Sequence, residues 1–313
     1  MLVEAQTGGS PQGHSKWLRR SVRHLSDELQ ELGHAASRMT VARLLHEEDY
    51  SLRVNRKRLT GPPHPDRDRQ FRYIDKQVSR FLRAGKPVVS ADAKKTELIG
   101  NFKNAGRSWC RQPYEVSAHD FRSEALHVAV PYGLYVVNQN RGFVTVSLSA
   151  NTAELAVDSL VRWWLSPGQW DFADADEVLL LCDSGGSNGC RPRLWKHRLQ
   201  TRLVDPFGLT VTVCHYPTGA SKWNPVEHRL FGPISENWEG QPLRSLAIML
   251  AYIRGTTTET GLEVRAHVTR RTYRTKIKIS NQEMTSLNLE RHRICPKWNY
   301  TIRPRSLPLQ AAS

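Results

Sequence analysis

The sequence predicts an α/β fold, in which a mixed β-sheet is flanked by helices. Two apolar runs of β-type composition, Pro87–Asp92 and Val178–Asp183, each end in a carboxylate, and helical patterns lie between and after such runs. The chain has 313 residues, of which 39% are hydrophobic. This length suits one large domain or two medium ones, and the apolar content excludes a wholly disordered chain.

The N-terminal part of the chain is expected to be helical after a disordered start. Residues 1–15 are rich in Gly, Ser and Gln and lack periodicity, which predicts disorder. Within residues 16–60, apolar spacing predicts helices over Ser21–Leu32 and about Thr40–Glu48, joined by a turn after Gly33. This pattern favours a helix-turn-helix-like DNA-binding region, and an ordinary helical hairpin is the alternative.

A linker and a longer helix are predicted for residues 61–86. The run Gly61–Pro65 has the composition of a linker, and Asp66–Arg83 carries apolar residues on one helical face. Gly85 and Pro87 are expected to end this helix.

Residues 87–255 are predicted to form the central domain. After the first short strand, the expected order is three antiparallel strands, then helix, strand, helix, strand and helix, which is the order of a ribonuclease-H-like mixed sheet. Residues 256–313 form a basic C-terminal region with a short helix at Ser280–Leu289 and a loose polar end. The expected strands after the first are His127–Val130, Leu134–Asn138, Gly142–Leu148, Val178–Asp183 and Leu209–Cys214, and the expected helices lie at Ala153–Trp164, Arg193–Arg202, Asn224–Trp238 and Leu243–Arg254.

The charge distribution indicates a polyanionic partner. The formal net charge is +15, and it is concentrated in two segments. Residues 51–90 carry 11 basic and 3 acidic side chains, and residues 254–305 carry 12 basic and 4 acidic ones. Such clustering favours nucleic acid as the partner, while generic solubility charge is the alternative. The basic residues expected to contact DNA phosphates in the first segment are Arg53, Arg56, Lys57 and Arg58.

Cysteine usage and hydropathy exclude several other classes. The five cysteines are odd in number and form no C-x-x-C pair, so neither a disulfide framework nor a zinc ribbon is indicated. The longest nearly apolar run, Leu246–Ile253, is far shorter than the roughly 20 residues that a membrane-spanning helix needs. No secretory signal is visible, and the expected location is the cytoplasm, in association with the nucleoid.

Three carboxylates have the placement of metal ligands. Asp92 and Asp183 each end an apolar strand, so both can lie at one edge of the sheet. Glu227 falls in the first turn of a helix that Asn224 and Pro225 are expected to begin. These predicted catalytic residues suit two Mg²⁺ ions, with Mn²⁺ as a substitute, and phosphoryl transfer on nucleic acid. The structural alternatives are turn-initiating aspartates and a capping box that accounts for Glu227.

Other polar residues near these carboxylates are candidates for substrate contact. Lys94 and Lys95 follow Asp92 and can bind DNA phosphate, as can Lys222 ahead of Glu227. His215 follows an expected strand and is a further candidate. Each of these side chains has a solvated or core role as its alternative. The glycine-rich stretch after Asp183 lacks the G-x-x-x-x-G-K-[ST] pattern, which excludes a nucleotide-triphosphate loop.

Several motifs of the chain match a known family in order and spacing. They are Ser37–Asn55, His64–Asp68, Ser90–Asn104, Asp183–Gly189, Ser221–Asn224, Glu227–Phe231, Asn237–Gly240 and Trp298–Ile302. Through these motifs the chain resembles the ISAzo13 family of insertion-sequence transposases, also described as Rhodopirellula-type DDE transposases. The resemblance extends from about Arg20 to Arg305.

The resemblance implies a ribonuclease-H-like catalytic domain that cuts DNA at transposon ends and joins it to target DNA. It places the family's DDE triad at Asp92, Asp183 and Glu227. It also implies DNA as the partner and a homo-oligomer in the synaptic complex. Compared with the family, the N-terminal region is expected to be shortened. The alternatives are a catalytically decayed DNA-binding remnant, a ribonuclease-H-like nuclease without strand transfer, and a transcription regulator.

Overall fold

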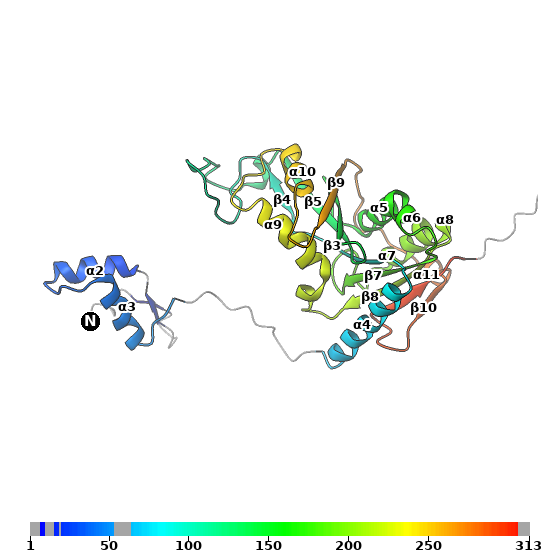
Figure 1. Ribbon diagram of the computed structural model, residues 1–313, viewed down its shortest axis with the longest axis horizontal. Coiled ribbons are helices and arrows are strands. Elements are labelled where there is room, and N and C mark those ends of the chain that lie inside the picture. The colour runs from blue at the N-terminus through cyan, green and yellow to red at the C-terminus, as the bar shows by residue number, and fades with distance from the viewer. Residues whose placement is uncertain (1–6, 10–15, 19, 53–63, 306–313) are drawn as a thin grey trace, which may run out of the picture. The chain divides into compact units, whose positions relative to one another are not determined.

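The computed structural model describes residues 7–9, 16–18, 20–52 and 64–305, and the chain divides into two compact units (Figure 1). The first unit spans residues 1–60 and the second spans residues 61–313. The predicted phosphate contacts Arg53, Arg56, Lys57 and Arg58 lie outside the described residues. Among the described residues, no helix is long and apolar enough to cross a membrane.

The first unit contains the two predicted helices, α2 (Val22–Glu31) and α3 (Arg38–Glu47). The hydroxyls of Ser21 and Ser37 accept hydrogen bonds from backbone N–H groups of the first turns, so these serines fix where the helices begin. A small core of Leu25, Ala36 and Val41 holds the helices together. Both helices are confirmed, and their binding to DNA stays a prediction.

The disorder predicted for residues 1–15 is wrong for part of that segment. Strand β1 (Thr7–Gly9) pairs antiparallel with β2 (Lys16–Leu18). The hydrogen bonds between β1 and β2 join backbone groups of residues whose side chains show no apolar periodicity. The pattern of apolar side chains therefore does not predict this pairing.

The described residues of the second unit form a nine-stranded mixed sheet. Its order is β10-β11-β8-β7-β3-β5-β6-β9, and β4 pairs with β5. Strands β3, β7 and β8 are parallel, whereas β5 runs antiparallel to β3 and β6. The central order β6-β5-β3-β7-β8 is the predicted ribonuclease-H-like arrangement, which is confirmed. The strands are β3 (Val88–Ala93), β4 (Glu97–Ile99), β5 (His127–Val136), β6 (Arg141–Ser147), β7 (Glu177–Asp183), β8 (Thr210–Tyr216), β9 (Glu263–Thr269), β10 (Leu289–Arg291) and β11 (Asn299–Ile302).

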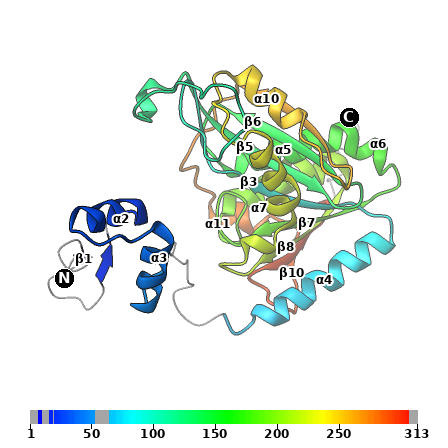
Figure 2. The same ribbon diagram turned by 60° about the vertical axis from the view of Figure 1, so that its left-hand side comes forward.

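Helices cover both faces of this sheet (Figures 1 and 2). On one face, α5 (Ala153–Trp163) and α7 (Arg193–Leu199) enclose the largest apolar core, which includes the fully buried Trp195. On the other face, α4 (Arg67–Arg83) packs near β7 and β8, while α10 (Leu246–Arg254) packs against β9. The shorter helical elements are η1 (Arg122–Glu124), η2 (Trp164–Gly168), α6 (Gln169–Asp171), η3 (Gln200–Val204), α8 (Asp205–Phe207), η4 (Ser221–Trp223), η5 (Glu227–Phe231), α9 (Gly232–Asn237) and α11 (Asn281–Thr285).

Helix α4 is bound tightly to the sheet of the second unit. The side chain of Gln70 is fully buried and donates hydrogen bonds to the backbone oxygen of His215, at 2.9 Å, and to Oδ1 of Asn299, at 2.7 Å. Asn299 returns a hydrogen bond of 2.7 Å to Gln70. The helix predicted at Asp66–Arg83 is therefore confirmed, and it is part of the same core as β8 and β11.

Two expectations about strands are wrong. The strands expected at His127–Val130 and Leu134–Asn138 are one strand, β5, because its neighbours continue the ladder past Pro131 and Gly133. The described part of the predicted loose end, up to residue 305, is not loose, because all four residues of β11 are buried and pair with β8.

Candidate active site

Asp92 and Asp183 lie at the carboxyl ends of neighbouring parallel strands. The register pairs Ala91 of β3 with Cys182 of β7, so each aspartate is the next residue on its strand. Polar sequence follows both strands, and the carboxyl ends of parallel strands are where open α/β sheets place their sites. The structure therefore brings these two predicted residues together at one edge of the sheet.

Glu227 begins η5, a π-helical turn that packs over β5 and β6. Its carboxylate interacts electrostatically with both Asp183 and Asp92. In the described part of the chain, no group of three or more His, Cys, Asp or Glu side chains is arranged so that it could hold a metal ion. The three carboxylates are therefore close enough to interact electrostatically, but they are not arranged as a preformed metal site.

The protonation of this site reflects burial and crowding of like charge. Burial, followed by the charges of Asp183 and Glu227, raises the pKa of Asp92 to about 7, although the Ala93 N–H that donates to Asp92 at 2.7 Å opposes this rise. Burial and then Asp183 also raise the pKa of Glu227, while the ammonium of Lys94 lowers it. Neighbouring carboxylates at this edge repel one another when no cation lies between them. The ionised form of each carboxyl group is therefore disfavoured.

A buried hydrogen-bond network that the sequence analysis did not predict holds Asp183 in place. The amide of Asn224 is fully buried and donates to Oδ1 of Asp183 at 3.0 Å. The oxygen of the same amide accepts a hydrogen bond from the hydroxyl of Ser90. That hydroxyl accepts in turn from the backbone N–H of Val226, at 2.9 Å. The network joins β3, β7 and the turn that carries Glu227.

The capping box that was the structural alternative for Glu227 is not formed. The side chain of Asn224 bonds to Ser90 and Asp183, and η5 has no side-chain cap. A sequence signal for the network does exist, because Ser90 is a polar residue in the middle of an apolar strand. A buried hydroxyl at such a position needs a partner.

His215 and Lys94 have structural partners instead of free, substrate-facing positions. His215 is fully buried, and its Nδ1–H donates to the backbone oxygen of Asp183 at 2.8 Å. Burial lowers the pKa of His215 to about 4, so the ring is neutral. The ammonium of Lys94 donates to Glu97 at 2.7 Å and lies 4.9 Å from the centre of the Trp238 ring. The side chain of Lys94 is 7% exposed, and its contact with DNA phosphate stays a prediction.

The other two predicted lysines remain accessible. The side chain of Lys95 is 68% exposed, although its ammonium lies 3.8 Å from a carboxylate oxygen of Glu97. Lys222 is exposed, and its ammonium lies 5.2 Å from the centre of the Trp223 ring. Contact of Lys95 and Lys222 with DNA stays a prediction.

Gly133 lets η5 approach the sheet. It pairs with Asp92 in the β3–β5 register. A Cβ at this position would lie 2.6 Å from two ring carbons of Phe231 and 3.1 Å from Cδ2 of Leu230, both buried side chains of η5. The absence of a side chain here therefore sets the depth at which the turn bearing Glu227 sits.

Replacing Gly133 with Ala is expected to lower the free energy of unfolding by about 2 kcal/mol, since overpacking a filled core typically costs about 1–3 kcal/mol. Chemical denaturation measures the loss. The matched control is Gly232→Ala, because a Cβ at Gly232 would lie at an ordinary 3.5 Å from the nearest atom, the backbone oxygen of Glu227, and the backbone there is helical. Equal stabilities of the two variants would contradict this account of the packing.

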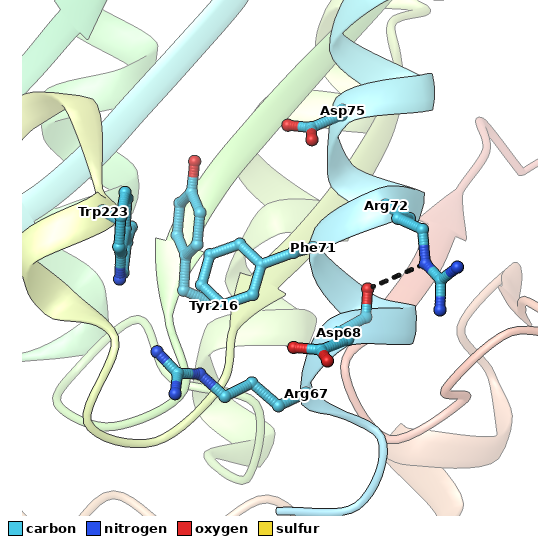
Figure 3. A pocket seen from close by; sticks show the side chains of 7 residues that line it. All are labelled: Arg67, Asp68, Phe71, Arg72, Asp75, Tyr216 and Trp223. Carbon is cyan, nitrogen blue, oxygen red and sulfur yellow. Dashed lines mark hydrogen bonds between the residues drawn. The ribbon is translucent and has the colours of Figure 1, made fainter. Parts of the chain in front are cut away.

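An aromatic-lined pocket of about 780 Å³ adjoins the carboxylate edge (Figure 3). Tyr216, one of its walls, pairs with Asp183 in the β7–β8 register. The ring of Phe71 lies 6.0 Å from those of Tyr216 and Trp223. The charged side chains that line the pocket are Arg67, Asp68, Arg72 and Asp75, two of each sign.

The fold and the carboxylate edge together define a class of protein. A ribonuclease-H-like sheet with aspartates ending two adjacent parallel strands and a glutamate on a later helical turn is typical of enzymes that transfer phosphoryl groups in nucleic acids. The sequence matches the family described as the Rhodopirellula transposase DDE domain over residues 1–304. The chain belongs to this family of DDE transposases, so it is an enzyme that cleaves and transfers DNA strands, and the family implies use of a divalent metal ion.

Several solved structures of Mos1 transposase are similar to this chain. One is a paired-end complex with the left transposon end, at 18% identity and a TM-score of 0.43. Others are the mariner paired-end complex with Mn and the strand transfer complex, both at 17% identity and a TM-score of 0.42. Each comparison covers 76% of this chain and 71% of the other. No curated protein matches the chain.

Proposed function

We propose that Asp92, Asp183 and Glu227 are the metal-binding triad of this transposase, and that they hold two Mg²⁺ ions, for which Mn²⁺ can substitute. The observation that carries the proposal is the register that places Asp92 and Asp183 at adjacent strand ends. The raised pKa of Asp92 supports it, because a divalent cation would relieve the repulsion that raises this pKa. Carboxylate oxygens are also the ligands that Mg²⁺ prefers.

The residues of the chain orient this site before any metal ion binds. Asn224 fixes one carboxylate oxygen of Asp183, and the neutral ring of His215 holds the backbone oxygen of the same residue. Lys94 contributes positive charge near Glu227. When bound, the divalent ions supply activation of the attacking oxygen and stabilisation of the leaving oxygen, so a side-chain general base is not required.

The reaction consists of two displacements at phosphorus. In the first, water attacks a phosphodiester at the transposon end and the bond to the 3′-oxygen breaks, which frees a 3′-hydroxyl. In the second, this hydroxyl attacks a phosphodiester of target DNA and displaces a new 3′-hydroxyl. Two ends must be held at once, so we propose a homo-oligomer as the working form. It acts on chromosomal DNA in the cytoplasm, in association with the nucleoid.

Two other functions remain distinguishable from this one. A decayed DNA-binding remnant is disfavoured because all three carboxylates are present and Asp183 is held in place by Asn224. A nuclease without strand transfer would give nicked DNA without joined product, so gel analysis of the products separates it from a transposase.

Calorimetric titration with Mn²⁺ tests the triad without knowledge of the transposon ends. The full chain, Asp183→Asn and the control Asp174→Asn are each titrated with a DNA duplex present. Asp174 is exposed and precedes β7, whose opposite end carries Asp183. Saturable binding by the wild type and the control, weakened in Asp183→Asn, would support the proposal. Equal binding by all three proteins, or none by any, would overturn it.

A further inference from the structure

A second pocket beside the carboxylates is lined by five cationic side chains and by no carboxylate. Its volume is about 690 Å³, and its wall includes Ser184 and Gly185, the two residues that follow Asp183. The cations are Arg191, Arg193, Lys196, Arg291 and Lys297.

Segments far apart in the sequence build this pocket. Arg191 comes from the loop after β7, and Lys196 comes from α7. Arg291 ends β10, and Lys297 lies in the turn between β10 and β11. The basic C-terminal region therefore brings positive charge to the loop that follows a triad residue.

The five positive charges are not neutralised within the part of the chain that the structure describes, where none of them forms an ion pair with a carboxylate. Three have backbone oxygens as partners. Lys196 donates to Cys190 at 2.5 Å, Arg193 to Ile279 at 3.2 Å and Arg291 to Pro296 at 2.8 Å. These bonds orient the side chains but leave the charge of the pocket in place.

Lys196 is the member that most needs an anion. The residue is 3% exposed, and burial followed by the charge of Arg291 lowers its pKa to about 8. A buried ammonium without a counter-ion is costly, and an anion in the pocket would offset that cost.

The two pockets differ in the ligand that they suit. The charges around the aromatic pocket of Figure 3 balance, with two arginines and two aspartates. The second pocket carries five positive charges and no negative one. A concave site lined by charges of one sign attracts ligands of the opposite charge.

We propose that this five-cation pocket binds backbone phosphate of the DNA substrate next to the carboxylate site. The proposal rests on the proposed function, because it takes DNA as the substrate of the neighbouring carboxylates. Phosphate held here would fix the position of the strand relative to Asp183. Guanidinium groups suit this role, since their donors match phosphate oxygens in pairs.

The salt dependence of DNA binding tests the proposal. The full chain binds a fluorescein-labelled duplex of arbitrary sequence in EDTA, and anisotropy gives the affinity. Arg191 and Lys297 are exposed, so both are replaced with Ala in one variant. Each lost phosphate contact lowers the slope of log affinity against log salt by about 0.9, or about 1.8 for both. Between ~50 and ~200 mM salt, the wild type then loses about tenfold more affinity than the variant.

The matched control is Arg111→Ala with Arg122→Ala, which removes two exposed cations outside the pocket and outside the two basic segments of the chain. Its slope is expected to equal that of the wild type. Lys196→Met, which keeps the bulk of the buried chain, is expected to lower the slope by about 0.9. An unchanged slope in the Arg191 and Lys297 variant, or an equal fall in the control, would overturn the proposal.

The outcome separates the pocket from the triad. Titration of the Arg191→Ala, Lys297→Ala variant with Mn²⁺ reports on the carboxylates alone, and the proposal expects wild-type binding. If the wild type itself binds no Mn²⁺, the proposed function fails, whereas the salt slopes still decide whether the pocket holds phosphate.

Discussion

Asp183→Asn is expected to lower DNA cleavage and strand transfer by about 10³-fold or more. The substitution removes a negative charge from the proposed metal site but keeps the size of the side chain. Even a single preorganised electrostatic contact to a transition state is typically worth about 10²–10³ in rate. A lost metal ligand affects both the attacking and the leaving oxygen, so the loss is expected at the upper end of that range.

The measurement uses a DNA duplex that carries an end of the element, obtained from the inverted repeats that flank its gene. Cleaved and joined products are quantified in Mg²⁺ and in Mn²⁺. Asp174→Asn is the control, and it should keep the rate of the wild type. If Asp183→Asn kept more than about a tenth of the activity, the assignment of the triad would be wrong.

Asp92→Asn is expected to stabilise the fold in neutral and alkaline solution. The pKa of Asp92 is about 7 in the folded chain, against an ordinary value of 3.8. Between these two values the folded state retains a proton that the unfolded state has lost, so the wild type loses stability as the pH rises. A neutral amide avoids this loss, and we expect a gain of about 2–4 kcal/mol at pH 8.

The pH profile identifies the cause of this gain. In EDTA, the two proteins should have nearly equal free energies of unfolding at about pH 3, where Asp92 is largely protonated in both states. The difference should grow to about pH 7 and then remain constant. Chemical denaturation across this range measures it. A difference independent of pH would show that packing, and not ionisation, separates the variants.

The positions of the two aspartates could be predicted because their signal is local. An apolar strand that ends in a carboxylate is visible in a few residues, and parallel strands bring such ends to one edge. The network around Asn224 could not be predicted in this way. It joins Ser90 to Asn224 across 134 positions and Asn224 to Asp183 across 41. Only the tertiary structure shows that the buried amide of Asn224 bonds to Asp183 in place of a helix end.

The fold was predictable in its centre and less so at its edges. Strand β7 has an almost continuous apolar run, and β3 and β8 are rich in valine, which a sequence reveals directly. Strands β10 and β11 are short, and the polar residues of β11 are buried against partners elsewhere in the chain, such as Gln70 and Thr212. Their pairing depends on β8, so local composition predicted a loose end.

Frameshift mutations near the 3′ end of the gene would remove β9, β10 and β11, and the pairing of these strands determines what such mutations do to the fold. Strand β9 forms one edge of the sheet, and β10 with β11 forms the other, although all three come after residue 262. A frameshift that removes them leaves β6 and β8 as open edges, which are templates for aggregation. We expect such a shortened chain in the insoluble fraction of a cell lysate. A late frameshift would therefore silence the element by misfolding, and would not release an unregulated nuclease.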